Sequence, residues 1–163
     1  QMIFNFGEKK FIQKCKVSGV DGLIVVDLSF PDNKNFAKLC KKNSICFVQL
    51  IAPTTTAKRM REIIKNSHEM IYMISTISTT GSALKYSIKK IINNYNIIKR
   101  IKPSKNVVIG FGITEKTISN LRSADGLVVG SAICREITRS LKDRQNPVTN
   151  VSKLVRKLKN KII

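Results

Sequence analysis

Two glycines flank Phe111 where a predicted strand gives way to a predicted helix. The segment 106–117 reads NVVIGFGITEKT, with the apolar run Val107–Ile109 before the glycines and a Thr-Glu pair beginning at Thr114 after them. The run is typical of a strand buried on both faces of a parallel sheet, and the Thr-Glu pair is typical of a helix start. Glycine at a strand end often serves only the turn. A turn without β-carbons also lets backbone N–H groups approach an anion, so the chemistry offered here is phosphate binding.

Two further loops that contain glycine follow predicted strands. Gly81 comes after the apolar run Met70–Ile74, and Gly130 with Ser131 comes after the run Gly126–Val129. Ligands of parallel α/β folds bind at the carboxyl ends of the strands, and in barrels the loops after the last two strands often form a phosphate site. Ser131 is expected to cap the helix that follows it and to present its hydroxyl to the anion. The predicted phosphate-binding residues are Gly81, Gly112, Gly130 and Ser131.

Apolar side chains near the same strand ends indicate what the phosphate is attached to. Phe111, beside the glycines, and Tyr72, within its strand, are either ordinary core aromatics or the walls of an apolar pocket. Such a pocket would suit a flat hydrophobic group joined to a phosphate. The predicted pocket residues are Ile24, Leu50, Tyr72, Ile74, Phe111 and Val128.

The carboxylates and the single histidine do not complete an acid–base site. His68, Asp21 and Asp125 precede their predicted strands, on the face opposite to the glycine loops, and are expected to be structural. Only Asp27 among the 10 acidic residues directly ends a strand. General acid–base catalysis commonly needs two tuned groups, so this sheet is catalytically incomplete. A Ser/His/Asp triad and a histidine-rich metal site are excluded because the only histidine lies on the wrong face.

The cysteines, the apolar runs and the start of the chain indicate in which cellular compartment the protein is expected. The four cysteines show no C-x-x-C spacing, so we predict neither a metal site nor a disulfide framework and expect a reducing cytoplasm. No apolar run approaches the roughly 18 residues needed to span a bilayer. The chain begins at Gln1 without a signal-peptide pattern, and we expect a fragment that lacks its true N-terminus.

The formal net charge of +20 raises nucleic acid or an anionic membrane as a partner. The lysines are spread through the predicted helices, and aromatic residues that could stack on bases make up only 6% of the chain. We therefore expect no nucleic-acid and no membrane partner. A basic nucleic-acid-binding module, in which the glycines merely turn the chain, is the alternative from a different class.

Strand-like runs alternate with helical patterns along residues 1–163. Helices are predicted over 84–98 and 148–162, where apolar residues recur at spacings of three and four. The alternation predicts one α/β domain with a parallel sheet and right-handed crossovers, either open and doubly wound or curled into a barrel. The predicted strands are Gly22–Val26, Cys46–Ile51, Met70–Ile74, Val107–Ile109 and Gly126–Val129.

Several segments, taken in this order, resemble the α subunit of tryptophan synthase almost from end to end of the chain. They are GVDGLIVVDLS at 19–29, APTT at 52–55, the strand of Tyr72 with S-x-x-x-x-T-G at 75–81, GFGI at 110–113 and ADGLVVGSAI at 124–133. The resemblance implies a TIM (β/α)8 barrel of which this chain supplies about the last five βα units. It also implies an enzyme that cleaves indole-3-glycerol phosphate to indole and glyceraldehyde 3-phosphate.

The resemblance extends to individual residues. The four glycine-loop residues match the family's phosphate contacts, the six apolar residues match its indole pocket, and Thr80 matches a threonine of its lid loop. The family's catalytic glutamate and aspartate belong to strands upstream of Gln1, so the fragment alone is expected to be inactive. No cofactor is expected on this chain. Pyridoxal phosphate is expected only in a partner β subunit, within an α2β2 tetramer.

Two positions depart from the family pattern. Ser78 replaces a glycine of the lid loop, and Ser29 replaces the proline of a D-L-P turn. Other phosphate-binding barrels, such as thiamin phosphate synthase or an isomerase of histidine biosynthesis, share the glycine loops. They give no reason for APTT together with Tyr72 and Thr80.

Overall fold

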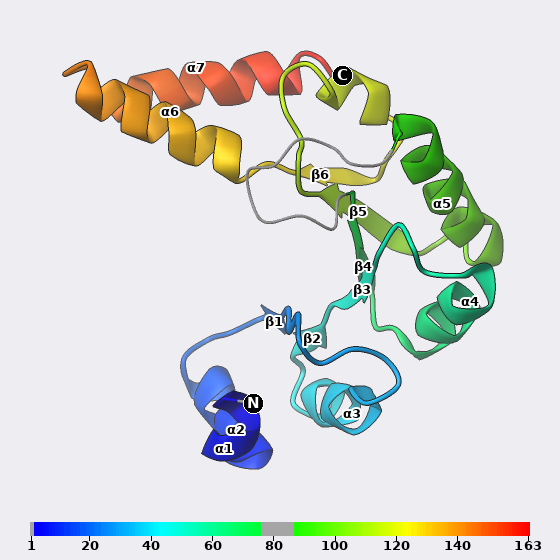
Figure 1. The fold of residues 1–163 in the computed structure, drawn as a ribbon. Coiled ribbons are helices and arrows are strands. Elements are labelled where there is room, and N and C mark those ends of the chain that lie inside the picture. The colour runs from blue at the N-terminus through cyan, green and yellow to red at the C-terminus, as the bar shows by residue number, and fades with distance from the viewer. Residues whose placement is uncertain (1, 76–86) are drawn as a thin grey trace.

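The computed structural model describes residues 2–75 and 87–163. Figure 1 shows these residues as an open arc, with the strands on its inner side and α3, α4 and α5 on its outer side. The strands are β1 (Gly22–Leu23), β2 (Cys46–Phe47), β3 (Gln49–Ile51), β4 (Met70–Ile74), β5 (Asn106–Gly110) and β6 (Gly126–Val128). The helices are α1 (Met2–Phe6), α2 (Glu8–Val17), α3 (Lys34–Lys42), α4 (Ala57–Asn66), α5 (Ile88–Ile101), the 3-10 helix η1 (Ile118–Leu121), α6 (Ser131–Lys142) and α7 (Pro147–Lys159).

The strands are parallel and stand in chain order. β1 pairs with β2, and β3, β4, β5 and β6 follow one another in a second sheet. An open doubly wound sheet reverses its strand order at a switch point, whereas a barrel keeps the order of the chain. The described strands show no reversal, and they therefore follow the barrel arrangement.

The predicted strand Cys46–Ile51 changes its partner at Val48. Its first two residues pair with β1, the Val48 N–H donates to the Leu23 carbonyl at 3.0 Å, and Gln49–Ile51 then pairs with β4. The predicted strand Gly22–Val26 was too long, because pairing stops at Leu23. The bounds predicted for β4 are confirmed, β5 is one residue longer at each end than predicted, and β6 is one residue shorter at its carboxyl end.

The two faces of the sheet are not equally buried. In β5, Val107 and Ile109 are fully buried against the helices, whereas Val108, which faces the other way, is half-buried. β4 alternates in the same manner, with Ile71 and Met73 buried and Tyr72 half-buried. The prediction of burial on both faces is therefore wrong for this part of the sheet. The half-buried residues line the inner side of the arc.

Two separate hydrophobic clusters form the core. The larger one joins β3, β4 and β5 to α4, α5, η1 and the end of α7, and the smaller one joins β2 to α2 and α3. The large cluster includes Ile51, Met60, Ile64, Ile71, Met73, Ile91, Ile98, Val107, Ile109 and Ile118. The small cluster consists of Ile12, Cys15, Phe36, Cys40, Ile45 and Phe47.

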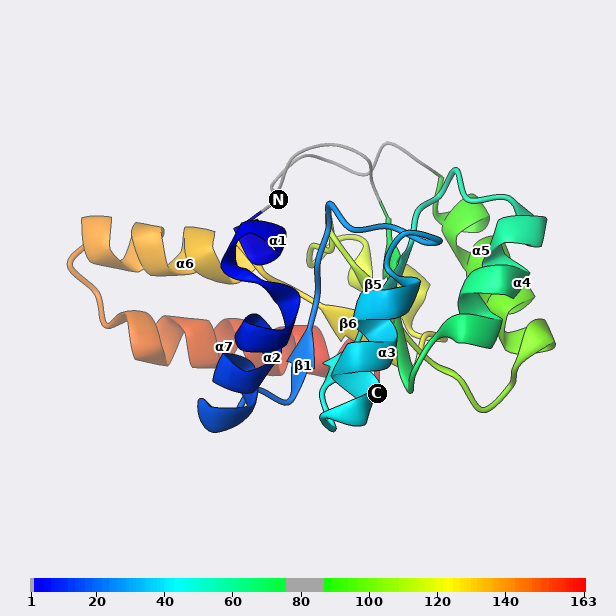
Figure 2. The ribbon, with the colours of Figure 1, turned by 90° about the horizontal axis from the view of Figure 1, so that it is seen from below.

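Side-chain caps set the starts of three helices. Thr56, Ser87 and Asn146 accept N–H groups from the first turns of α4, α5 and α7, respectively. The helix predicted over 84–98 is α5, which begins at Ile88 and runs on to Ile101. The helix predicted over 148–162 is α7, which packs against α6 as an antiparallel hairpin (Figure 2). No helix among the described residues is long and apolar enough to cross a membrane.

Thr114 does not begin an α-helix. The Thr117 hydroxyl accepts the Thr114 N–H at 3.0 Å and closes a turn, and only the four-residue helix η1 follows. Threonine hydroxyls that bond to nearby backbone compete with helix formation in this way. Glu115 in this turn contacts Lys157 and Lys161 of α7 at 2.8 and 3.1 Å. The predicted helix start is therefore wrong, and the turn is tied instead to the last helix.

Asp125 is structural, as predicted. Its carboxylate accepts the Tyr95 hydroxyl at 3.1 Å, the Lys99 ammonium at 2.9 Å and the Val107 N–H at 2.9 Å. Burial opposes ionisation, but the bonds from Lys99, Val107 and Tyr95 outweigh it and lower the pKa of Asp125. This carboxylate joins α5 to the first residues of β5 and β6.

We expect Asp125→Asn to destabilise the fold by about 1–2 kcal/mol at pH 7, because charged hydrogen bonds are lost. A carboxylate with a lowered pKa stabilises the fold above its unfolded pKa of about 3.9 and ceases to do so as pH falls through its folded value. The gap between parent and variant should therefore narrow below about pH 4. Urea unfolding at pH 7 and pH 3 measures this gap, with the exposed Asp143→Asn as a charge-matched control. An equal gap at both pH values would contradict the assignment.

Candidate functional site

One cavity at the carboxyl ends of β4, β5 and β6 gathers most of the predicted site. Its volume is about 200 Å³. The residues that line it are Tyr72, Phe111, Gly112, Ile113, Val128, Gly130 and Ser131. Six of these seven were predicted as phosphate or ring contacts, and the cavity thus places aromatic walls beside two glycine loops.

Gly110 makes room for the aromatic wall. Tyr72 and Gly110 lie on the same side of neighbouring strands, since Tyr72 pairs with Val108 and Ile74 with Gly110. A β-carbon on Gly110 would lie 1.7 Å from the Tyr72 hydroxyl oxygen and 2.3 Å from Cζ. The ring of Tyr72 in turn meets Phe111 edge to face, with centroids 6.0 Å apart and planes at 75°. The first glycine of GFG is therefore needed for packing.

Gly112, the second glycine of the GFG motif, is needed for its backbone conformation. Phe111 and Gly112 both adopt left-handed conformations, with φ of 69° and 63°. A left-handed phenylalanine is uncommon and costs on the order of 1–3 kcal/mol, so the surroundings must hold it in place. Two successive residues of this conformation turn the chain sharply beside the cavity, where Gly112 exposes its backbone without a β-carbon.

Ser75 holds this turn from the neighbouring strand. Its side chain is fully buried, its N–H donates to the Gly110 carbonyl at 3.0 Å, and its hydroxyl contacts the carbonyls of Gly110 and Phe111. A hydroxyl has one hydrogen to donate. The Gly110 carbonyl also accepts the Ser75 N–H, whereas the hydroxyl is the one donor to the Phe111 carbonyl among the described residues. Ser75 thereby fixes the residue that carries the strain.

The start of α6 supplies the other wall of the cavity. Gly130 is the N-cap and Ser131 is the first helical residue, so the prediction that Ser131 caps the helix is wrong. The Gly130 carbonyl accepts the N–H groups of Ile133 and Cys134, at 2.9 and 3.1 Å. The N–H groups of Ser131 and Ala132 precede these bonds and have no partner within the helix. Together with the partial positive charge of the helix start, they favour an anion in the cavity.

The cavity is polar at its amides but holds no acid. Burial raises the pKa of the Tyr72 hydroxyl, which therefore stays neutral and can donate a hydrogen bond at physiological pH. Neither an acidic side chain nor a histidine is among the described residues that line this cavity. The arrangement can bind and orient a ligand, but these residues offer no general base.

Other predicted site residues lie elsewhere. Leu50 lines a separate cavity of about 30 Å³ together with Val25 and Val26, and the side chain of Ile24 is 50% exposed after β1. Ile74 is half-buried at the end of β4 and is not among the residues that line the main cavity. Gly81 and Thr80 lie outside the described residues, as does Ser78. Three residues of the predicted ring pocket therefore line the main cavity, and the other three do not. The three that line it are Tyr72, Phe111 and Val128.

Three residues of the site were not predicted. Gly110 and Ser75 were visible in the motifs GFGI and S-x-x-x-x-T-G, but their roles depend on the register of β4 against β5, which no local pattern reveals. Ile113 lines the cavity and was noted only as part of GFGI. His68 lies where it was predicted, ahead of β4 and away from this cavity.

Comparison with known proteins agrees with this geometry. A family model described as tryptophan synthase alpha chain matches residues 1–163. A tryptophan synthase alpha chain of Pelagibacter ubique (strain HTCC1062) is 61% identical over 161 residues, which cover 99% of this chain and 61% of that relative. One of Methanocaldococcus jannaschii is 33% identical over 144 residues, or 86% of this chain and 50% of the relative. The chain thus spans less than two thirds of these relatives.

Solved structures of the same name share the fold. The tryptophan synthase alpha chain of Legionella pneumophila superposes with a TM-score of 0.79 at 25% identity, covering 98% of this chain and 58% of that one. A chain of the tryptophan synthase a2b2 complex of Pyrococcus furiosus gives a TM-score of 0.80 at 31% identity, covering 98% and 64%. These barrels confirm the predicted fold class, α/β and part of a TIM (β/α)8 barrel. Since its family model matches from the first residue to the last, the chain belongs to the tryptophan synthase alpha chain family.

Proposed function

We propose that the cavity between Tyr72, Gly112 and Ser131 binds indole-3-glycerol phosphate for its aldol-type cleavage to indole and glyceraldehyde 3-phosphate. One observation carries this proposal. The cavity brings aromatic side chains and free helix-terminal amides together within about 200 Å³. A ring stacks against apolar walls while a phosphate accepts N–H groups, so a substrate with both parts is held at both ends. The activity would make the protein a lyase of tryptophan biosynthesis.

The residues divide into two groups under this proposal. Phe111, Tyr72 and Val128 contact the indole ring, and the amides of Gly112, Gly130 and Ser131 contact the phosphate. Gly81 and the lid residue Thr80 are proposed to complete the phosphate side, and Ile24, Leu50 and Ile74 the ring side. Proton transfer at the scissile bond needs carboxylates, and the described lining of this cavity contributes none. These residues therefore bind and orient the substrate, and other groups supply the acid and the base.

The partner follows from the family. A solved relative is titled as part of a tryptophan synthase a2b2 complex. We propose that this chain pairs with a β subunit that carries pyridoxal phosphate and receives indole, in the cytoplasm. No cofactor is proposed for this chain itself. Since the comparisons give one family throughout, the other phosphate-binding barrels and the nucleic-acid module are not favoured.

Titration with indole propanol phosphate, which carries ring and phosphate but cannot be cleaved, tests the binding site. We expect the backbone amide signals of Phe111, Gly112 and Ser131 to shift, and inorganic phosphate alone to move Gly112 and Ser131 more than Phe111. Gly112→Val should weaken binding at least about tenfold, because a β-branched residue at φ 63° is strained and its side chain enters the cavity. If these three signals stay still at millimolar ligand, the cavity is not the substrate site.

A further inference from the structure

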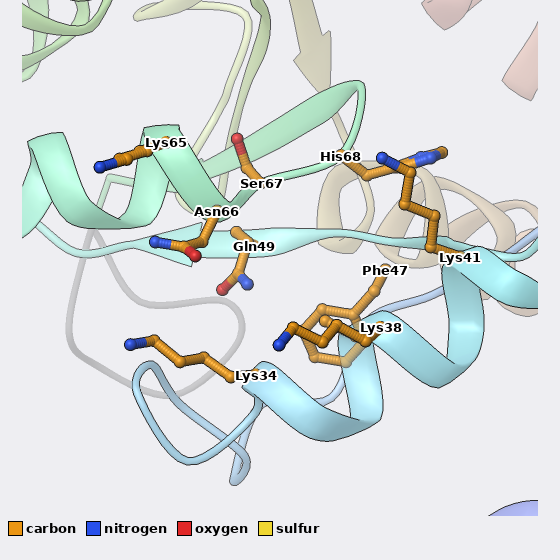
Figure 3. Close-up of a pocket in the computed structure, with 10 residues that line it drawn as sticks. Lys34, Lys38, Lys41, Phe47, Gln49, Lys65, Asn66, Ser67 and His68 are labelled. Carbon is orange, nitrogen blue, oxygen red and sulfur yellow. The ribbon is translucent and has the colours of Figure 1, made fainter.

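A second cavity lies between two helices outside the sheet, toward the amino end of β4, and is lined by lysines that the proposed reaction does not use. It has a volume of about 140 Å³ and lies between α3 and the end of α4 (Figure 3). The residues that line it are Lys34, Ala37, Lys38, Lys41, Phe47, Gln49, Lys65, Asn66, Ser67 and His68. Four lysines and no carboxylate are among them, so the cavity is strongly positive.

Three of the lysines form a row. Lys34, Lys38 and Lys41 follow one another at spacings of four and three on α3, which places them on one face of the helix. At a rise of about 1.5 Å per residue, the row extends roughly 10 Å along the helix axis. Figure 3 shows this row on one side of the cavity and Lys65, Asn66, Ser67 and His68 on the other, with Phe47 and Gln49 between them. Like charges at these spacings repel one another and destabilise a free helix.

Helix electrostatics explain only part of this charge. Lys41 and Lys65 stand in the last turns of α3 and α4, where the helix dipole favours a cation. Lys34 is the first residue of α3, where the dipole disfavours a cation, and Lys38 lies in the middle. The ammonium of Lys34 also lies 4.9 Å from the centroid of the Phe30 ring, which holds it near the cavity. Lys34 and Lys38 therefore need another reason to share this face.

Polar groups beneath the lysines are buried. The Nδ1 atom of His68 is buried and has no hydrogen-bond partner among the described residues. The backbone carbonyl of the same residue accepts the ammonium of the buried Lys105, which brings a fifth positive charge beneath the cavity. Gln49 is buried as well and exchanges hydrogen bonds with Asn33 at 2.9 and 3.3 Å. These buried atoms shape the cavity, and the exposed lysines are the groups that can meet a ligand.

We propose that this cavity binds a small molecule bearing a diphosphate or longer oligophosphate, held by Lys34, Lys38 and Lys41 on one side and by Lys65 on the other. The length of the lysine row suits two or more linked phosphates better than one, because a single phosphate reaches fewer of the ammonium groups. The lysines supply charge-assisted hydrogen bonds. The site is distinct from the substrate cavity, which lies at the carboxyl ends of the strands.

Inorganic pyrophosphate is the probe, at constant ionic strength, with nitrogen NMR of the ring of His68 as the readout. His68 is the single histidine of the chain, so its ring signals are unambiguous. We expect pyrophosphate to shift those signals and the amides of Ala37 and Ser67, and inorganic phosphate to do so only at concentrations at least about tenfold higher. A shift at Gly112 without one at His68 would assign pyrophosphate to the substrate cavity and overturn the proposal.

Two double variants distinguish a specific binding site from non-specific attraction by the net charge of +20. Lys34→Gln with Lys38→Gln should weaken pyrophosphate binding about tenfold or more. Lys14→Gln with Lys16→Gln removes the same charge from α2, away from the cavity, and should change the affinity less than about twofold. Equal weakening by both pairs would show diffuse attraction and would refute the site. All four lysines are exposed, so the fold should tolerate either pair.

Discussion

Gly110→Ala is expected to lower the affinity for indole propanol phosphate at least about tenfold, and to destabilise the fold by about 1–3 kcal/mol. The new methyl group would lie 1.7 Å from the Tyr72 hydroxyl oxygen, so the ring has to leave its place. Phe111 meets that ring edge to face, and the cavity is the space open to it. The displaced ring therefore fills the pocket that it normally lines. Calorimetric titration and thermal unfolding measure the two effects.

Two further variants show whether the ring is the cause. Tyr72→Leu in the Gly110→Ala background removes the clashing atoms and should recover most of the lost stability, but not the affinity, since an aromatic wall is still missing. Gly130→Ala is the steric control, because no atom of the described residues lies within 4 Å of its added methyl group, and its own effect on stability is limited to the preference of the N-cap for Gly over Ala. If the effects of Gly110→Ala and Tyr72→Leu on stability simply add, the two residues do not compete for space.

Ser75→Ala is expected to weaken phosphate binding about tenfold or more and to weaken binding of the ring less, because Tyr72 and Val128 keep their places on the ring side. The variant removes the hydroxyl that contacts the Phe111 carbonyl and leaves that partly buried acceptor without its donor, at a cost of about 1–3 kcal/mol. The left-handed Phe111, at φ 69°, then relaxes and carries the Gly112 amide away from the anion.

Two ligands distinguish this effect from general loosening of the fold. Affinity for indole propanol phosphate should fall far more than affinity for indole, which has no phosphate. Ser67→Ala is the matched control, because it also removes a hydroxyl that bonds a backbone carbonyl, at 2.8 Å, but at the opposite end of β4. Parallel losses for both ligands would mean that Ser75 supports the fold only and does not position the loop.

Sequence patterns predicted the elements whose signals are local. The strand Met70–Ile74 was predicted with its observed bounds, because its continuous apolar run is flanked by a polar residue at each end. The predicted helix at Thr114 was wrong because a threonine hydroxyl can close a turn as readily as it caps a helix. Ser131 was predicted as the N-cap of α6, but it is the first helical residue, because Gly130 takes the N-cap position without any side chain.

What the sequence could not provide is the register between strands. Tyr72 reaches Gly110 only because β4 and β5 pair with Tyr72 opposite Val108, 36 residues later in the chain. The unknown register also explains why only part of the ring pocket was predicted. Leu50 pairs with Tyr72 across the sheet yet lines another cavity, because the chain before it turns toward β1. The phosphate loops were predicted better, since glycine and helix starts are local features.

The change of partner at Val48 divides the described core into two packing units. Residues before it belong to the small cluster of α2, α3 and β2, and residues after it belong to the large cluster around β4 and β5. The first unit has only a two-residue ladder and a six-residue core to oppose local opening. We therefore expect the amide protons of the first unit to exchange with solvent faster than those of the candidate binding loops, which belong to the second unit.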